Sequence, residues 1–308
     1  MKKLLVVLAM LVAVSANSQW VKTNPGYAGA VLDMAVSGTN IFAVTMGSGA
    51  FLSTNNGSYW NLVNNGLPTN QWFYALAVSG TNIFLGSDAG GVFLSTNNGT
   101  SWAAANNGLT NFDIRALTVS GTNIFAGTYG GGVFLSTNNG TSWAAKNSGL
   151  WNLDVVAFAV SGTAIFAGTY AGGVFRSTNN GTNWISVGLG GIMSLVVSGT
   201  NIFAGTRGNG VRLSTNNGTN WITPSNELWD KYILSLAVSG NNIFAGTSFG
   251  VFRSTNNGTN WTSVGITNLD IESFAVSGTN FFAGTNGGAF RTTDNGSNWT
   301  YVSNGLMY

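Results

Sequence analysis

The side chains that could do chemistry in this 308-residue chain form a small set, because it contains no histidine and no cysteine. Their absence excludes Ser-His-Asp and Cys-His nucleophile systems and the usual transition-metal ligand sets, so we expect no metal site and no cofactor. Carboxylates remain. Asp270 and Glu272 share one face of an expected strand, and Asp33 would belong to the neighbouring unit if the chain closed into a ring. Two carboxylates at a suitable separation could hydrolyse a glycoside.

A second set of residues combines aromatic faces with carboxylates at regular spacing. Its members are Trp72, Asp88, Asp113, Tyr129, Asp154 and Tyr170. They occupy two positions of a repeated unit at which the residue type changes while the flanking sequence stays fixed. The fold does not require a particular residue there, so these positions could bind a ligand. Stacking surfaces with interleaved carboxylates suit a glycan or a cationic peptide. The alternative is that they are solvated turn residues that drifted after duplication. Arg115 lies two residues after Asp113 and could pair with it.

The repeated unit is marked by a polar octet such as "STNNGTSW", which occurs in seven variants. The closing tryptophans are Trp60, Trp102, Trp143, Trp184, Trp221, Trp261 and Trp299. They recur every 37 to 42 residues, a period that indicates a repeat architecture.

Each unit contains four short runs that predict strands. In the third unit these are "IRALTVS" from Ile114, "IFAGT", "GVFLS" and "SWAAK", separated by turns rich in Gly, Asn and Ser. Neighbouring runs should pair as antiparallel hairpins. Seven such meanders predict an all-β fold, a seven-bladed β-propeller of four-stranded antiparallel blades, because a ring protects the sheet edges. A phenylalanine recurs in every second run and should form the apolar layer between sheets. A parallel β-helix is the alternative.

The octet should form the turn between the third and fourth strands. Its third residue can bond back to turn amides, its Gly can take a positive φ, and its Trp should lie over the hairpin. It resembles the Asp-box, Ser/Thr-x-Asp-x-Gly-x-x-Trp, of sialidases, sortilin-type receptors and photosystem II stability-factor-like propellers. Thr292, Asp294, Gly296 and Trp299 match outright, and the other six copies carry Asn in place of the Asp.

The resemblance implies the propeller fold, with the octets as structural turns away from a ligand face. It does not bring the sialidase activity, which needs a converging arginine triad. Arg176, Arg253 and Arg291 instead each precede an octet, at a surface position of the third strand.

The first eighteen residues read as a secretory signal peptide, with a basic start, an apolar run and a small-residue cleavage site. We therefore expect a secreted protein, periplasmic or extracellular, with residues 19–308 forming the propeller and no membrane span. The stretch "QWVKTNPG" at 19–26 resembles an eighth fourth strand. It would either close the ring beside the last blade or add an outer strand.

Together these features predict a non-enzymatic binding or scaffold protein with a glycan or peptide ligand on the face opposite the octets. Two alternatives stay open, namely a glycoside hydrolase using the carboxylates of that face and, from the photosystem-factor resemblance, an assembly factor for an envelope complex. We expect no nucleic-acid partner because no basic face is visible. The sequence does not indicate an oligomeric state.

Overall fold

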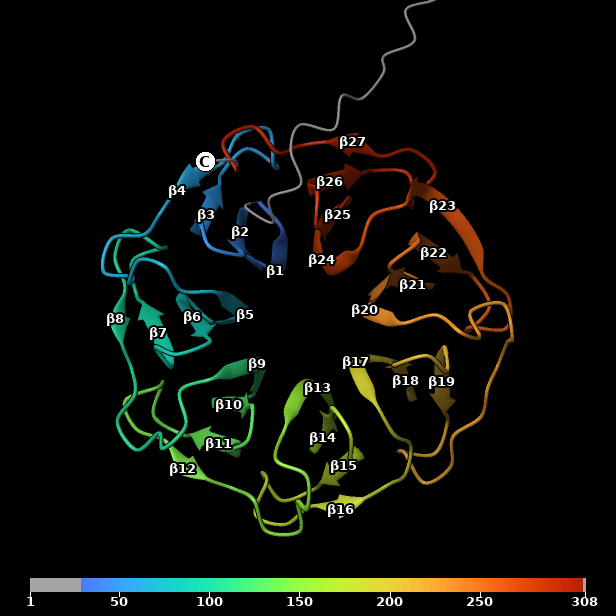
Figure 1. Cartoon of the computed structure of the whole chain (residues 1–308), viewed down its shortest axis with the longest axis horizontal. Helices are drawn as coiled ribbons and strands as arrows, with labels where there is room; N and C mark the ends of the chain where they lie inside the picture. The colour runs from blue at the N-terminus through green and yellow to red at the C-terminus, as the bar shows by residue number, and fades with distance from the viewer. Residues whose placement is uncertain (1–28, 307–308) are drawn as a thin grey trace, which may run out of the picture.

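Seven antiparallel sheets stand in a closed ring in the computed structural model, which describes residues 29–306. Each sheet is a meander whose strands run outward in chain order, and the first strand of each faces the middle of the ring (Figure 1). The predicted all-β, seven-bladed β-propeller is therefore confirmed. We number the blades 1 to 7 in chain order.

The strands fall into four sets by their place in the blade. The innermost strands are β1 (Val31–Ser37), β5 (Phe73–Ser79), β9 (Ile114–Ser120), β13 (Val155–Ser161), β17 (Ile192–Ser198), β20 (Ile233–Ser239) and β24 (Ile271–Ser277). The second strands are β2 (Asn40–Thr45), β6 (Asn82–Ser87), β10 (Asn123–Thr128), β14 (Ala164–Thr169), β18 (Asn201–Thr206), β21 (Asn242–Thr247) and β25 (Asn280–Thr285). The third are β3 (Gly49–Ser53), β7 (Val92–Ser95), β11 (Gly132–Ser136), β15 (Gly173–Ser177), β19 (Val211–Ser214), β22 (Gly250–Ser254) and β26 (Gly288–Thr292). The outermost are β4 (Asn61–Leu62), β8 (Ala103–Ala104), β12 (Ala144–Ala145), β16 (Ile185–Ser186), β23 (Thr262–Thr267) and β27 (Thr300–Tyr301).

Blade 5 differs because its outermost run is reduced to a single bridge between Leu213 and Ile222. In blade 1 the third residue after the octet Trp, Val63, donates its amide to Ala50 at 2.9 Å and extends the pairing. Blade 5 carries Pro224 at that position. Proline has no amide hydrogen to donate, so the fourth strand does not extend there.

The recurring phenylalanine of the second strand fills the space between adjacent sheets, as predicted. All seven copies are fully buried, namely Phe42, Phe84, Phe125, Phe166, Phe203, Phe244 and Phe282. Phe42 packs with Phe73 and Trp102 of blade 2, and Phe282 packs with Val31 and Trp60 of blade 1. The core is thus a set of seven apolar layers, one at each junction between blades.

The octet acts between blades as well as within its own turn. Within the turn, Asn97 Oδ1 accepts the Ser101 amide at 2.9 Å, and Ser95 Oγ accepts the Gly99 amide at 2.8 Å. The Trp does more than lie over its own hairpin. Trp102 Nε1 donates to the carbonyl of Val63 in the preceding blade at 2.7 Å. The octet therefore also binds the outer part of the preceding blade.

The same kind of contact, between an octet Trp and the neighbouring blade, closes the ring. Trp60 of blade 1 donates Nε1 to Val302 O at 2.7 Å and its backbone amide to Asn304 O at 2.8 Å. Both acceptors follow β27, so the two ends of the ring are joined by an octet contact like those between consecutive blades.

The expected signal peptide and the run at Trp20 lie outside the described residues. Within residues 29–306, no helix has the length and apolar character needed to cross a bilayer.

Candidate ligand-binding face

The two variable positions of each unit are tied together by the backbone. Asp88 N donates to Trp72 O at 3.1 Å, and Tyr129 N donates to Asp113 O at 2.9 Å. The equivalent bond occurs in blades 1, 4, 5 and 7 as well. In an antiparallel meander the turn between the second and third strands and the loop entering the first strand emerge at the same end. The variable residues therefore share the face opposite the octets, which we call the variable face.

Inner strands place further side chains at this end of the central opening. Each inner strand has a register shift next to its start, which leaves one residue without a partner on the second strand. Such β-bulges re-aim a side chain. Tyr74, Arg115 and Glu272 occupy three of these bulges.

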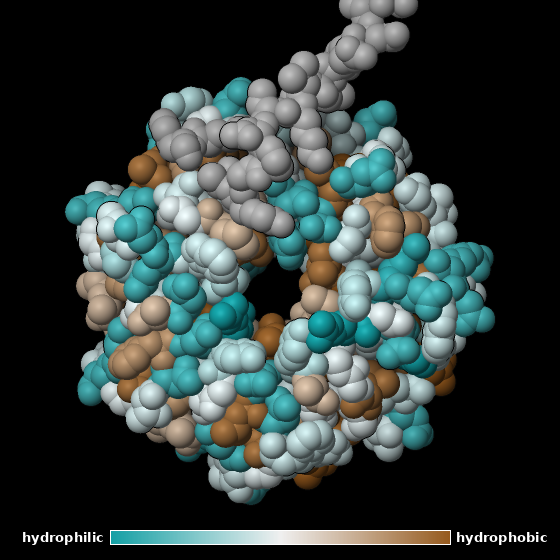
Figure 2. Space-filling view, viewed as in Figure 1, coloured by the Kyte–Doolittle hydropathy of each residue, from teal (hydrophilic) through white to brown (hydrophobic). Residues whose placement is uncertain are grey.

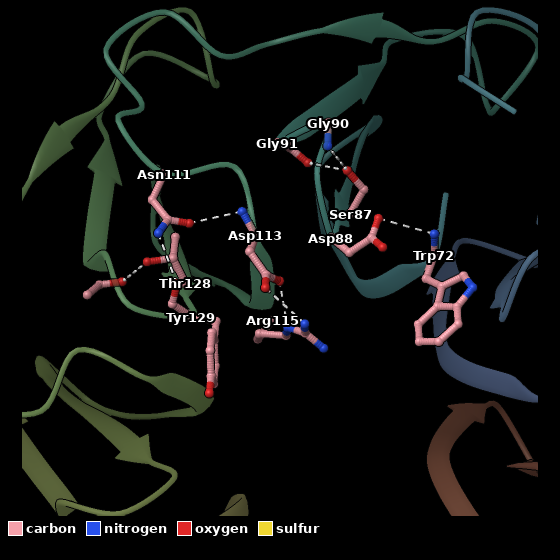
Figure 3. A network of polar contacts seen from close by, with 11 residues as sticks. Trp72, Ser87, Asp88, Gly90, Gly91, Asn111, Asp113, Arg115, Thr128 and Tyr129 are labelled. Atoms are coloured by element: carbon pink, nitrogen blue, oxygen red, sulfur yellow. Dashed lines mark hydrogen bonds and ion pairs between the residues drawn. The ribbon is translucent and has the colours of Figure 1, made fainter. Parts of the chain in front are cut away.

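Arg115 contacts residues of both blade 2 and blade 3, and Figure 3 shows its bonds to Asp113. Its guanidinium binds Asp113 through Nε at 2.6 Å and Nη2 at 2.9 Å. It also lies over the ring of Tyr74 at 4.0 Å and near that of Tyr129 at 5.8 Å. The expected Asp113–Arg115 pair is thus confirmed. The Asp113 carboxylate is neutralised, and the planar guanidinium becomes part of an aromatic surface.

The other two carboxylates of the set differ in their surroundings. Asp88 Oδ1 accepts the Trp72 amide at 3.3 Å and so stabilises its own loop. The Asp154 side chain has no hydrogen-bond or ion-pair partner among the described residues. It is therefore the carboxylate of this set most available to a ligand.

Aromatic side chains are exposed mainly on this face. Trp72 is 44% exposed, Tyr129 52% and Tyr170 37%, and Figure 3 shows the rings of Trp72 and Tyr129 pointing the same way with Arg115 between them. The structure adds four exposed aromatics from the same loops and turns that sequence analysis did not select, namely Phe112, Trp151, Trp229 and Phe249, and it also exposes Tyr232, which stands at the variable position of Trp72 in blade 6. Most of them lie outside the strands, where no periodicity marks them. A useful signal would have been any large aromatic in a segment entering the first strand.

Two further cations, Arg207 and Lys231, lie among these aromatics in blades 4 to 6. The Arg207 guanidinium lies over Tyr170 at 4.8 Å and near Tyr232 at 6.0 Å. Lys231 Nζ lies 4.7 Å from the ring centre of Phe249. Neither cation forms a salt bridge within residues 29–306. The variable face therefore has a sector with two cations in blades 4 to 6, which also holds the exposed Asp230, apart from the carboxylates of blades 2 to 4.

Of the three carboxylates expected to act in hydrolysis, Asp270 and Glu272 interact with each other, whereas Asp33 is bound to backbone amides. Burial raises the pKa of Glu272, and the nearby Asp270 raises it further. Asp33 does not complete the set, because its carboxylate accepts the amides of Leu76 at 2.7 Å and Met34 at 2.8 Å. Burial raises the pKa of Asp33 to about 7. Asp33 thus links the inner strands of blades 1 and 2.

The face is an open platform around a central hole, and Figure 2 shows apolar and polar residues interspersed around that opening. A shallow recess on it is lined by Asn226, Trp229 and Asp230. No group of three or more acidic side chains that could hold a metal occurs in the described part of the chain.

Comparison with known proteins identifies structural neighbours. No protein-family model and no curated protein sequence matches this chain. The extracellular domain of a B. thetaiotaomicron protein superposes with a TM-score of 0.72 at 18% identity, covering 85% of this chain and 38% of that one. The structure titled "YCF48 bound to D1 peptide" gives 0.67 at 16%, covering 86% and 92%. A GH74 xyloglucanase from Xanthomonas campestris gives 0.71 at 15%, covering 93% and 56%.

These likenesses show the fold. At such low identity they carry no residue-level correspondence, and this chain spans well under half of the B. thetaiotaomicron protein. The propeller is thus common to a peptide-bound structure and a glycan-cleaving enzyme. The fold alone therefore does not distinguish peptide binding from glycan cleavage, and either function must be argued from the side chains of the variable face.

Proposed function

We propose that this chain is a non-enzymatic binding propeller that takes an extended peptide or a glycan on its variable face. The observation that carries the proposal is the exposure of Trp72, Tyr129 and Tyr170 on one face, above turns that the backbone holds in place. Exposed aromatics fixed on a rigid scaffold bind ligands with little loss of side-chain entropy.

The charges of the face favour a peptide over a neutral glycan. Asp154 offers a carboxylate that has no partner within residues 29–306, whereas Arg207 and Lys231 offer cations held over aromatic rings. A peptide with both charge signs could use the two sectors at once. The fold neighbour solved with a bound peptide is consistent with this preference.

Binding of purified residues 19–308 to peptide and glycan arrays tests the proposal. The double variant Trp72→Ala, Tyr129→Ala should lose at least about tenfold in affinity for the ligand found, since truncating an aromatic anchor typically costs about 1.4 kcal/mol or more. Tyr59→Ala is the matched control, because Tyr59 is 47% exposed but lies in an octet on the opposite face. Unchanged binding by the double variant, or an equal loss in the control, would reject the assigned face.

A glycoside hydrolase is the second candidate. It is favoured by the Asp270–Glu272 pair, in which the pKa of Glu272 is raised as a general acid requires, and by the GH74 fold neighbours. Turnover of chromogenic glycosides that disappears in Glu272→Gln and Asp270→Asn, while peptide binding persists, would establish it. No turnover across a broad panel would remove it.

Export and a role as an Asp-box scaffold are part of the same proposal. A signal peptide over residues 1–18 would deliver the propeller to the periplasm or the extracellular space, where its ligand would be met. Assembly of an envelope complex would be one use of a peptide-binding face, and stable co-purification with a membrane complex would distinguish it from free ligand binding.

A further inference from the structure

We propose that the loop between blades 5 and 6 holds a binding site for one neutral pyranose unit of a glycan, formed by Asn226, Trp229 and Asp230. The three residues line one shallow recess. They lie between β19 and β20, whereas Trp72 and Tyr129 belong to blades 2 and 3. The inference therefore goes beyond the proposed function, and it holds whether or not Trp72 and Tyr129 bind a peptide.

The loop is anchored to the propeller by the two residues between Asn226 and Trp229. Leu228 is buried in the apolar layer between blades 5 and 6. The Glu227 carboxylate accepts the backbone amide of Trp261, the octet Trp of blade 6. In blades 1 to 4 a backbone carbonyl of the preceding blade accepts this amide instead. Glu227 thus replaces a contact between blades where the fourth strand of blade 5 is reduced, and the loop is held in a fixed conformation.

The side chains that line the recess are largely unused by the fold. Within residues 29–306, the side chains of Asn226 and Asp230 form no hydrogen bond and no ion pair. Trp229 is 46% exposed, and the Arg212 guanidinium lies over its ring at 5.4 Å from the ring centre. Arg212 also donates to Thr223 Oγ1, which fixes it there. An indole supported by Arg212 therefore stands beside an amide and a carboxylate whose hydrogen-bonding capacity is free.

This combination of groups matches the chemistry of a pyranose. The CH face of a sugar ring packs against an aromatic face, as of Trp229, and its hydroxyls donate and accept hydrogen bonds. The Asp230 carboxylate can accept from two adjacent hydroxyls, and the Asn226 amide can both donate and accept. Two acceptor oxygens at fixed positions fit only one arrangement of adjacent hydroxyls, so the site should prefer one sugar epimer over another.

The charges around the recess disfavour a charged ligand. Arg212 lies over Trp229, and Lys231 follows Asp230 in the chain, so a cationic ligand would meet two positive charges. An anionic ligand would meet the Asp230 carboxylate. Like charges placed next to each other lower affinity, whereas a neutral polyhydroxyl ligand has no such cost. The recess therefore suits a neutral sugar better than an acidic or basic peptide side chain.

Saturation-transfer NMR of the full chain with the methyl glycosides of glucose, galactose, mannose and xylose tests the site. We expect transfer to at least one glycoside and a clear difference between epimers. Trp229→Ala should lower the affinity at least about fivefold, whereas Trp229→Phe keeps an aromatic face and should retain most of it. Asp230→Asn should remove the difference between epimers. Asp230 has φ +71°, a conformation that asparagine also adopts, so this change leaves the backbone in place.

Trp151→Ala is the matched control, because Trp151 is a more exposed tryptophan in the corresponding loop between blades 3 and 4. Its affinity should equal that of the wild type. An equal loss in Trp151→Ala would mean unspecific stacking on exposed indoles and would overturn the proposal, as would no transfer to any of the four glycosides. Binding that is lost in the Trp72→Ala, Tyr129→Ala double variant but kept in Trp229→Ala also overturns it, and would place the glycan on blades 2 and 3, which the proposed function allows.

Discussion

Arg115 shows how one residue changes the chemistry of its neighbours. Asp113 alone would be a candidate acid or base, but its salt bridge with Arg115 at 2.6 Å neutralises it. The same guanidinium, spread over Tyr74, offers a flat surface with polar edges. The local arrangement therefore suits recognition better than proton transfer, and it leaves Asp154 as the open carboxylate of the set.

Asp33 should make stability depend on pH. Its pKa is raised from 3.8 to about 7 in the folded protein, so between these values the folded state binds more protons than the unfolded state. The stabilising contribution is therefore complete below about pH 4 and is lost as the pH rises through 7, with a slope of at most about 1.4 kcal/mol per pH unit.

Urea unfolding from pH 4.5 to 8 measures this effect. Glu272 also has a raised pKa, so the informative quantity is the difference between the wild type and Asp33→Asn. The difference in free energy of unfolding between the two proteins should change between pH 5 and 7 by more than the experimental error. Above pH 7 it should stay constant. A difference independent of pH would show that Asp33 is ionised throughout.

At the scale of the element, the octet combines a turn with a contact between blades. Gly99 takes φ +79°, and a Cβ there would lie 2.8 Å from Phe42 Cε1 of the preceding blade. The glycine is therefore needed both for its backbone conformation and for the close approach of two sheets.

Gly99→Ala should lower the free energy of unfolding by about 1–3 kcal/mol, from backbone strain and overpacking together. Gly121→Ala is the control, because Gly121 has φ +62° but nothing within 4 Å of a Cβ. Thermal unfolding should show a smaller loss for Gly121→Ala. Equal losses would mean that the contact with Phe42 does not matter.

At the scale of the whole molecule, the junction between blades 1 and 7 closes the ring without a connecting chain segment to reinforce it. Trp60 joins blade 1 to blade 7, whereas Trp102 makes the same bond between blades that the chain already connects. Trp60→Phe and Trp102→Phe each remove one indole N–H and leave a carbonyl without its donor, at about 1–3 kcal/mol.

Hydrogen exchange should distinguish the two variants. We expect faster exchange throughout β26 and β27 in Trp60→Phe, since the ends of the ring can separate, and only local change near β4 in Trp102→Phe. Similar local effects in both would indicate that the ring is closed mainly by its apolar layers.

Much of the architecture could be predicted because the same local sequence pattern, with the same turns and strand-forming runs, recurs in seven units. The runs "IRALTVS" and "GVFLS" match β9 and β11 residue for residue, and the buried Phe of the second strand followed from its recurrence. The fourth strand was overestimated, since "SWAAK" forms a strand only at Ala144–Ala145, with one further bond from the Lys146 amide to Val133 O at 2.8 Å. Edge strands receive hydrogen bonds from one side alone, so their length depends on residues elsewhere, such as Pro224 in blade 5.

The sequence by itself determined the class of fold, the number of blades and the face on which the variable residues lie, because turn chemistry and strand alternation act over a few neighbouring residues. Only the tertiary structure decided what those residues touch. It showed that the octet Trp reaches into the preceding blade, that Arg115 lies over Tyr74 of blade 2, that Asp33 faces blade 2, and that further aromatics join the variable face. These contacts join residues that are far apart in the chain or lie in irregular loops, so no local pattern encodes them.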